Sequence, residues 1–276
     1  MVRVRAFRTI ENAVRREGYT CVAGVDEVGR GCLAGPVVAG AVALNPRKYV
    51  PRIADSKTVT ALEREYLFER IVRAAVAWSV SIVEADEIDR LNIHRASLEA
   101  MNRAVMGMAP LPDFVLVDAF RIPNIPMAQR AVMHGDACCT AIAAASIVAK
   151  VTRDRIMRTL HASDPRYGFD RHKGYATKDH LEAVALHGYS AAHRKSFRVH
   201  GAVVGTWEGV AQVGTVDGGD VTLVGRVDAV ALDAAPDANV PTEPTDPTVP
   251  TDSTVHGTHP SHVPTHPPRA RDTDGV

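Results

Sequence analysis

The 276-residue sequence contains no apolar run long enough to cross a membrane. Its longest candidate, residues 141–149, stops at Lys150, whereas a membrane-spanning helix needs roughly 18 or more such residues. The amino terminus, MVRVRAFRTI, is basic but has neither an apolar core nor a small-residue cleavage site. We therefore expect no membrane span and no secretory signal, and we predict a cytoplasmic protein.

Cysteine is scarce and lacks the spacing of a metal or redox motif. The sequence has 4 cysteines and no CxxC pair. Cys138 and Cys139 are adjacent, and all four cysteines lie among apolar or small residues. These features favour reduced, buried thiols in a cytoplasmic protein. No set of His and Cys residues has the spacing of a zinc site either.

The chain has no net charge, but its charges are divided unequally along its length. Of the 32 basic and 32 acidic residues, residues 201–276 contain 3 and 11, which leaves 29 basic and 21 acidic in residues 1–200. The first part therefore carries +8 and the second −8. A basic body with an acidic tail is typical of proteins that bind nucleic acid. An ordinary basic surface with a solubilising tail would have the same composition.

Large apolar residues are nearly absent from residues 233–276, which are dense in Pro, Thr, Asp and His. Such a segment buries too little surface to offset the entropy of ordering, so we predict a disordered tail. Residues 201–232 are intermediate in composition, and VTLVGRVDAVAL within them favours a short strand. Residues 1–200 remain as the predicted folded domain, with no evident internal repeat.

Residues 1–200 mix strand and helix patterns. Strands are predicted at residues 21–26, 36–44, 78–83, 114–118 and 131–133. Helices are predicted at residues 60–76, 93–108, 140–160 and 177–187. A glycine-rich connection joins the first two strands, which indicates an antiparallel pair. The order of elements predicts a single α/β domain with a mixed β-sheet.

Acidic residues stand where predicted strands and helices meet. Asp26 and Glu27 close the first strand, and Asp118 closes the strand FVLVD. Asp136 follows in MHGDACC, at the entrance of a helix of small residues. Taken alone, Asp118 fits a turn and Asp136 a helix cap equally well. The adjacent pair is harder to explain by folding, because like charges held close together repel.

A cluster of carboxylates at one sheet edge needs something to neutralise it. Divalent Mg²⁺ or Mn²⁺ suits a site built only from carboxylate oxygens. Two such ions about 4 Å apart are a known arrangement for in-line displacement at phosphorus. We therefore predict Mn²⁺ or Mg²⁺ as the cofactor, with two metal ions.

A glycine-flanked arginine follows the adjacent acids directly. Gly29 and Gly31 allow a ligand to approach the backbone, and Arg30 is held between them. A flexible turn would also explain these glycines, and the stretch does not match the GxxxxGK[ST] pattern of a P-loop. Its position beside the two carboxylates is what indicates a binding role.

Over roughly residues 20–200, several motifs in order resemble the ribonuclease HII family, the type-2 ribonucleases H. The matching segments are AGVDEVGRG (23–31), GPVVAGAV (35–42), DSK (55–57), EIDRLNI (87–93), VLVDAF (115–120), HGD (134–136), IAAASIVAKVTRD (142–154), YGFDRHKGYATKDH (167–180) and HRKSF (193–197). The resemblance implies a ribonuclease H-like fold, with a mixed sheet flanked by helices. It also implies a metal-dependent endonuclease that cuts the RNA strand of RNA–DNA hybrids.

For the reaction, the resemblance assigns the four acids as the residues that hold metal and activate the attacking water. These are Asp26, Glu27, Asp118 and Asp136. The implied substrates are RNA–DNA hybrids and duplex DNA that contains single ribonucleotides, which is cut 5′ of the ribonucleotide. The implied products carry a 3′-hydroxyl and a 5′-phosphate, and the implied role is ribonucleotide removal in DNA replication and repair. We expect a monomer.

For the substrate, the resemblance assigns Gly29, Arg30 and Gly31 to sensing the 2′-hydroxyl at an RNA–DNA junction. Tyr175 is the implied ring that packs on the nucleotide after the ribonucleotide. The 2′-hydroxyl distinguishes RNA from DNA at one position, and stacking on an aromatic ring tolerates any sequence. Basic residues in the matching segments are candidate phosphate contacts: Lys57, Lys150, Arg153, Lys173, Arg194 and Lys195.

The sequence departs from the family pattern beside the fourth acid. His134 stands where the family usually has lysine, which could weaken a phosphate contact or make it pH-dependent.

Two other functions remain open on the residues alone. One is a nucleic-acid binder of the same fold without catalysis, and the other is a metal-dependent 3′–5′ exonuclease on a similar sheet. The four acids argue against the first, and the GRG and HKGY segments are unexplained by the second.

Overall fold

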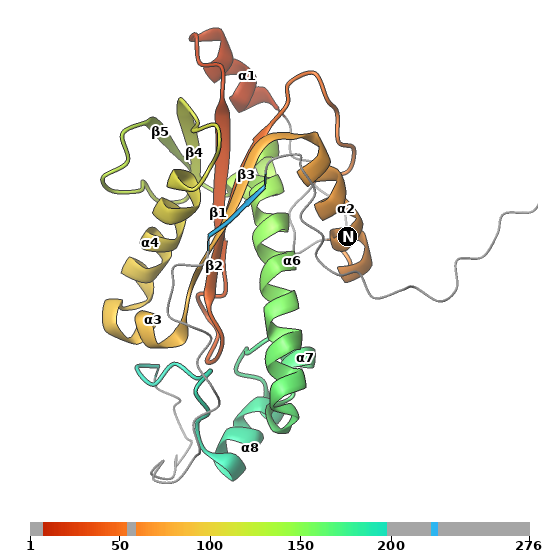
Figure 1. Cartoon of the computed structure of the whole chain (residues 1–276), viewed down its shortest axis with the longest axis vertical. Helices are drawn as coiled ribbons and strands as arrows, with labels where there is room; N and C mark the ends of the chain where they lie inside the picture. The colour runs from red at the N-terminus through yellow and green to blue at the C-terminus, as the bar shows by residue number, and fades with distance from the viewer. Residues whose placement is uncertain (1–7, 54–58, 198–221, 226–276) are drawn as a thin grey trace, which may run out of the picture. The chain divides into compact units, whose positions relative to one another are not determined.

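The computed structural model describes residues 8–53, 59–197 and 222–225, the last as backbone only. One mixed sheet has the strand order β5-β4-β1-β2-β3-β6 (Figure 1). The strands are β1 (Val22–Val28), β2 (Val37–Leu44), β3 (Ala75–Val83), β4 (Phe114–Asp118), β5 (Ala128–Val132) and β6 (Thr222–Gly225). The helices are α1 (Thr9–Arg16), α2 (Ala61–Ala74), α3 (Ala85–Leu91), α4 (Ile93–Met106), α5 (Gly135–Cys138), α6 (Thr140–Ser163), the 3₁₀ helix η1 (Pro165–Tyr167), α7 (Phe169–His172) and α8 (Lys178–His187).

The centre of the sheet confirms the predicted antiparallel start. Strand β1 pairs antiparallel with β2, with Asp26 opposite Gly40. On its other side β1 pairs parallel with β4, with Val25 opposite Val117. The carboxyl ends of β1 and β4 therefore lie at the same edge of the sheet, where the sequence places three of the four acids.

Helices cover both faces of the sheet. Helix α6 packs against β1 and β2, and α4 packs against β2 and β3 (Figure 1). Alternate residues of β2 serve the two sides: Val38 and Val42 join the core that includes α6, whereas Val37 and Ala39 join the core that includes α4. This alternation is the period of two expected of a strand buried on both faces.

Small residues let α6 lie directly on the sheet. A Cβ atom at Gly24 would sit 2.1 Å from the backbone carbon of Ala141. At Gly40 it would sit 2.6 Å from the carbonyl oxygen of Ala145. Only glycine fits at either position, because a contact under 3 Å between such atoms requires the backbone to shift. The helix that carries Lys150 is thereby held against the strand that carries Asp26.

Helix α1 closes the start of α6. The buried carboxylate of Glu11 accepts a hydrogen bond from the Ala141 N–H, at 2.7 Å. That N–H is one of the first donors of α6, which have no partner within the helix. Cys139, the N-cap residue, makes no side-chain cap. A residue far away in sequence therefore stabilises the helix start near Asp136.

Several element boundaries differ from the sequence prediction. The predicted helix at residues 60–76 begins as expected with a capping box of Thr60 and Glu63, but it ends at Ala74. Residues 75 and 76 belong to β3, because Ala75 pairs with Leu44 of β2 across a register shift that leaves Val76 between paired residues. The fifth strand is Ala128–Val132 rather than residues 131–133, and it pairs parallel with β4.

Short helices were not predicted at all. Helices α1, α3, α5 and α7 lie outside the four predicted helices. Each spans 8 residues or fewer, too short for helical periodicity to stand out in the sequence. Helix α1 packs against β1, α3 against α4 and α7 against α6.

The carboxyl-terminal part is described only in part. Strand β6 lies within the segment for which the sequence predicts a short strand, and it pairs antiparallel with β3. The chain divides into the units Met1–Ala231 and Leu232–Val276, and the predicted disordered tail lies outside the described residues. Across the part of the chain that the structure describes, no helix is long and apolar enough to span a membrane.

Candidate active site

The structure brings the four predicted acids together at the edge shared by β1 and β4. Asp26 and Glu27 lie near the carboxyl end of β1, and Asp118 is the last residue of β4. Asp136 lies in α5, the short helix that precedes α6. Asp26 and Asp136 are both buried. The adjacent acids of the sequence thus gain two partners from separate elements.

The acids lie close enough to affect one another's titration. Burial raises the pKa of Asp26 well above its usual range, and neighbouring carboxylates raise it further. Those neighbours, in decreasing order of effect, are Glu27, Asp118 and Asp136. A hydrogen bond from Ser146 of α6 opposes the shift. Charge on this cluster is therefore costly when nothing positive is bound.

Glu27 has a cation beside it and shifts less. Burial raises its pKa, and the neighbouring Arg30 lowers it again. The Arg30 guanidinium lies 3.1 Å from Glu27 Oε1. The glycine-flanked arginine therefore contacts the acid cluster directly.

Backbone hydrogen bonds fix the orientation of two acids. The Glu27 N–H donates to Asp26 Oδ1 at 2.8 Å. The Gly135 N–H donates to Asp118 Oδ1 at 2.8 Å. A Cβ atom at Gly135 would lie 2.4 Å from Ile142 Cδ1, so glycine is needed for this close turn. Asp118 thereby holds the turn that carries Asp136.

The donor atoms of this cluster suit a hard divalent cation. All four side chains offer carboxylate oxygens, the ligands that Mg²⁺ and Mn²⁺ prefer. Burial and then the neighbouring carboxylates raise the pKa of Asp26, and a bound cation would offset the negative charge of the cluster. Among the residues described, no three His, Cys, Asp or Glu side chains are grouped so that they could hold a metal ion. The donor types of the four acids therefore fit a divalent cation, but their positions in this structure do not form a complete ligand group.

The connection between β1 and β2 carries the glycine-rich element. Gly29 has φ of +95° and is buried against Arg153, whose Nε would lie 2.3 Å from an added Cβ. Gly31 is exposed, with open space around its Cα. The Arg30 guanidinium lies over the ring of Phe120, 5.7 Å from its centroid. Within this loop, Gly29 is therefore packed against a neighbouring side chain, whereas Gly31 is accessible from outside.

Tyr175 lies beside this loop, although the two are far apart in sequence. Its side chain is 43% exposed, and its hydroxyl is within hydrogen-bonding reach of the Cys32 thiol. The Leu33 N–H donates to the carbonyl of Gly174 at 2.8 Å. The structure thus brings the predicted ring next to the predicted ribose-sensing loop.

Two predicted phosphate contacts are wrong. The side chains of Arg153 and Arg194 are 0% exposed, so neither can reach a nucleic-acid backbone. Arg153 donates to the carbonyls of Pro36, Lys173 and Ala34, at 2.9, 2.9 and 3.1 Å. Burial of a cation costs less when it satisfies backbone carbonyls, and Arg153 ties the loop before β2 to the segment of Tyr175.

Arg194 is a second buried arginine that donates hydrogen bonds to backbone carbonyls of the loop between β1 and β2. It donates to the carbonyl of Gly35 from Nε and Nη2, at 3.0 and 2.8 Å, and to that of Arg30 from Nη1 at 3.0 Å. Burial lowers the pKa of Arg194 to about 10, so the guanidinium stays charged at neutral pH. The sequence motif HRKSF marked this residue, but nothing in the sequence indicated that it supports the glycine-rich loop.

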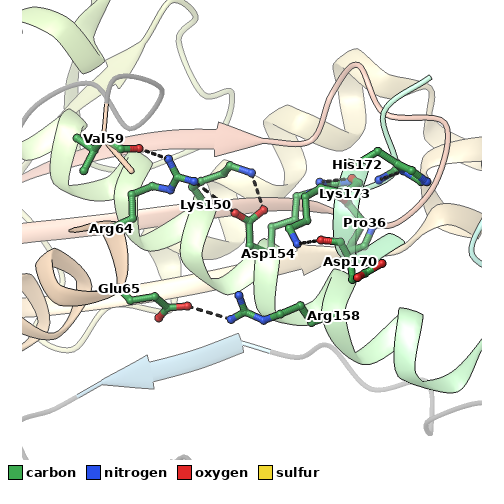
Figure 2. A network of polar contacts seen from close by, with 12 residues as sticks. Pro36, Val59, Arg64, Glu65, Lys150, Asp154, Arg158, Asp170, His172 and Lys173 are labelled. Carbon is green, nitrogen blue, oxygen red and sulfur yellow. Dashed lines mark hydrogen bonds and ion pairs between the residues drawn. The ribbon is translucent and has the colours of Figure 1, made fainter. Parts of the chain in front are cut away.

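Two predicted phosphate contacts lie in a partly exposed cluster around Asp154, shown in Figure 2. Lys150 Nζ lies 2.5 Å from Asp154 Oδ1, and Arg64 Nη2 lies 3.8 Å from Asp154 Oδ2. Lys173 donates to the Asp170 carbonyl, and burial lowers its pKa while Asp154 opposes that change. Three cations gathered around one buried acid leave an excess of positive charge.

The remaining predicted positions are easily placed. Lys57 lies outside the described residues, together with the rest of the DSK segment. Lys195 is exposed, and its N–H donates to Asp89 Oδ2 at 2.8 Å. His134 is exposed and adopts a left-handed conformation with φ of +53° as the N-cap of α5. The His134 carbonyl accepts a hydrogen bond from the Ala137 N–H at 3.1 Å, so this residue closes the turn around Asp136 through its backbone.

Sequence reasoning missed the surroundings of the loop and of Tyr175. Phe120, two residues after Asp118, is 46% exposed and supports Arg30. His172, His180 and His193 are buried behind Tyr175. The histidines stand in the HKGYATKDH and HRKSF segments, so their number in a polar stretch was the available clue. Phe120 stands in the VLVDAF segment, but nothing there indicated that it contacts Arg30.

Comparisons with known proteins show which proteins this chain is similar to. Residues 23–200 match the model of the family described as Ribonuclease HII. A ribonuclease HII of Ralstonia nicotianae is 53% identical over 67% of this chain and 80% of its own length. One of Aliivibrio fischeri is 50% identical over 68% of this chain and 91% of its own. A crystal structure of ribonuclease H2 from Pyrococcus horikoshii has a TM-score of 0.56 and 26% identity, covering 64% of this chain and 94% of that one.

Proposed function

The chain belongs to the ribonuclease HII family, and we propose that it cuts duplex DNA on the 5′ side of a single embedded ribonucleotide. Membership makes it a ribonuclease H, an endonuclease that hydrolyses the RNA strand of RNA–DNA hybrids, with a ribonuclease H-like fold. The observation that carries the finer proposal is the contact between the acid cluster and the glycine-rich loop, made by Glu27 and Arg30 at 3.1 Å.

The four acids are proposed to supply the chemistry of the cut. Two bound divalent cations, Mg²⁺ or Mn²⁺, would neutralise charge that develops at the scissile phosphate. The carboxylate oxygens of Asp26, Glu27, Asp118 and Asp136 would hold these cations, and one carboxylate would accept the proton of the attacking water. The leaving oxygen becomes a 3′-hydroxyl, and the phosphate remains on the 5′ end of the ribonucleotide.

The loop of Gly29, Arg30 and Gly31 is proposed to recognise the ribose. A 2′-hydroxyl both donates and accepts hydrogen bonds, and it is the group that distinguishes RNA from DNA at one position. Gly31 is exposed, so its backbone is accessible without a side chain in the way. Because the loop continues directly from Glu27, recognition of the ribose is coupled to the phosphate beside it.

Contacts with the rest of the substrate are proposed for Tyr175 and the basic cluster. The exposed ring of Tyr175 would pack on the nucleotide after the ribonucleotide, a contact that tolerates any base. Lys150 and Lys173, with Arg64 nearby around Asp154, would face backbone phosphates. We propose that the chain acts as a monomer in the cytoplasm, in the removal of ribonucleotides from DNA.

The test is a duplex with one embedded ribonucleotide and a label on the strand that contains it. With Mg²⁺ or Mn²⁺ the expected product is a single nick 5′ of the ribonucleotide, ending in a 3′-hydroxyl. An all-DNA duplex of the same sequence is the matched control and should remain intact. Progressive shortening of the all-DNA duplex would instead identify a 3′–5′ exonuclease, and binding without a nick would identify a catalytically inactive binder.

A further inference from the structure

We propose that His180 and His193, with His172 stacked beside them, form a directional chain of neutral imidazoles that positions Tyr175 against the ribonucleotide. The proposal deepens the function above and rests on the role of Tyr175 in it. The three side chains come from α7, α8 and the turn that follows α8. They are 9%, 0% and 1% exposed, in the order His172, His180, His193.

Hydrogen-bond partners fix where each proton lies. The Ser190 N–H donates to His193 Nδ1 at 3.0 Å, so that nitrogen is the acceptor and Nε2 carries the proton. His193 Nε2 lies 3.1 Å from His180 Nε2, which must accept. The proton of His180 is therefore on Nδ1, and it is donated to the Tyr175 carbonyl at 2.9 Å.

His172 is fixed in the same way from the preceding turn. The Gly174 N–H donates to His172 Nδ1 at 3.2 Å. Its Nε2 therefore carries the proton and donates to the Tyr167 carbonyl at 2.6 Å. The His172 ring stacks on that of His180, with centroids 4.3 Å apart and planes 15° apart. Imidazoles therefore hold the backbone around Tyr175 at two points. His172 accepts from the Gly174 N–H, and His180 donates to the Tyr175 carbonyl.

The chain also connects to the ribose-sensing loop. The Gly174 carbonyl, one residue before Tyr175, accepts from the Leu33 N–H at 2.8 Å. Beside it, Ala34 forms a bridge with His193. A shift of the histidine chain would therefore move Tyr175 relative to Gly29–Gly31. The ring and the loop must keep a fixed separation if they read neighbouring nucleotides.

The direction of the chain depends on every member being neutral. A second proton on His180 would lie on Nε2 and face the His193 Nε2–H across 3.1 Å, and a second proton on His193 would lie on Nδ1 and face the Ser190 N–H across 3.0 Å. Burial lowers the pKa of all three rings, to about 3 for His193. The charged groups that face them are Asp164, near His193, and Arg171, Asp170 and Asp179, near His172. The uncharged rings Tyr167, Phe169, Tyr189 and His187 complete the surroundings.

A pair of substitutions at His180 separates positioning from packing. The amide nitrogen of asparagine occupies the place of Nδ1, so His180→Asn keeps a donor for the Tyr175 carbonyl. Glutamine is longer and places its amide near Nε2, so His180→Gln loses that donor. Both variants remove the ring, so both lose the stacking on His172 and the same aromatic packing.

The readout is steady-state cleavage of the single-ribonucleotide duplex, beside urea unfolding of each variant. We expect His180→Gln to raise KM about two- to tenfold, the effect of one lost hydrogen bond, with kcat within about twofold. His180→Asn should restore KM to within about twofold of the parent. Because Tyr175 makes a contact present before the chemical step, its displacement should act on KM rather than on kcat.

Equal KM values for the two His180 variants, or a fall in kcat alone, would overturn the positioning role. If either variant fails to fold, the pair His193→Gln and His193→Asn decides, since glutamine keeps the Nε2 donor and asparagine does not. A parent protein that leaves the single-ribonucleotide duplex uncut contradicts the proposed function itself. A parent that nicks the duplex, with unchanged KM in every variant, contradicts only the histidine chain.

Discussion

The carboxyl end of β1 and the loop that follows it use buried polar groups in opposite ways. At the acid edge, formed by Asp26, Glu27, Asp118 and Asp136, burial and then the neighbouring carboxylates raise the pKa of Asp26 well above its usual range. Behind the loop, Arg153 and Arg194 are also buried, but their guanidinium groups donate to backbone carbonyls. The first region keeps charge available for a ligand, and the second uses charge to hold the backbone in place.

Both regions are needed for the selective cutting that we propose. A repulsive acid cluster provides chemistry but has no means of distinguishing RNA from DNA. A rigid frame of arginines and neutral histidines can hold a loop and a ring at a fixed separation, but it provides no chemistry. The contact of Arg30 with Glu27 joins the two regions.

The largest expected effect is a loss of kcat when one of the four acids is replaced. Asp118→Asn should lower kcat on an RNA–DNA hybrid on the order of 10³-fold or more, because it removes a proposed metal ligand. The asparagine oxygen can still accept from the Gly135 N–H, so the turn that carries Asp136 should stay in place. Steady-state cleavage measures the loss, and substrate binding without metal should remain near the parental value. Parental kcat in this variant would remove Asp118 from the chemistry.

The next largest effect is expected from replacing Arg194, one of the two buried arginines that hold the backbone of the glycine-rich loop. Arg194→Met leaves the carbonyls of Gly35 and Arg30 without their donor, so we expect a loss of about 2–4 kcal/mol in the free energy of unfolding. Urea unfolding measures it. The matched control is Arg158→Met, an exposed arginine paired with Glu65, where the loss should be at most about 1 kcal/mol. Similar losses in the two variants would contradict the supporting role of Arg194.

A smaller effect of opposite sign is expected for Asp26→Asn in the absence of metal. The folded state raises the pKa of Asp26, so it binds this proton more tightly than the unfolded chain, and stability falls as pH rises through the folded pKa. Removing the charge should therefore raise Tm at neutral pH, by about 2–4 °C for each kcal/mol of repulsion relieved.

The increase in Tm should shrink as pH falls below about 4, where the parental carboxyl is protonated in both states. Scanning calorimetry at several pH values, with and without Mg²⁺, measures this dependence. Added Mg²⁺ should narrow the difference from the parent. A variant that is less stable than the parent at neutral pH would show that Asp26 serves the fold rather than a ligand.

The smallest expected effect is on the link between the regions. Phe120→Leu removes the ring face beneath Arg30, a contact worth about 0.5–1 kcal/mol at an exposed site. We expect kcat/KM on the single-ribonucleotide duplex to fall about two- to fivefold. An all-RNA strand in a hybrid, with a 2′-hydroxyl at every position, should be cut nearly as well as by the parent. Equal losses on both substrates would place Phe120 in general substrate binding.

Much of the acid edge could be predicted from sequence, because its residues follow strand ends. Strand alternation and the apolar FVLVD segment placed Asp26, Glu27 and Asp118, and parallel pairing of β1 with β4 confirms that their ends share one edge. The motifs also marked Tyr175, which the structure brings beside the loop. The reaction roles of these residues stay predictions.

The frame could not be predicted, because burial of a charged side chain depends on contacts between distant segments. Arg153 looked like a surface cation on a helix, yet its partners are at positions 34, 36 and 173. The same applies to Glu11, whose partner Ala141 is 130 residues away. A single sequence shows the type of such a residue but not whether backbone carbonyls or water surround it.

The most direct test of the division between chemistry and selection is the position of the nick in a duplex with one ribonucleotide. The account predicts a single cut immediately 5′ of the ribonucleotide, dependent on Mg²⁺ or Mn²⁺, with a 3′-hydroxyl and a 5′-phosphate at the break. Mapping at nucleotide resolution on the end-labelled strand measures it. A cut elsewhere in the DNA, or no cut while the all-RNA hybrid is hydrolysed, would contradict the account.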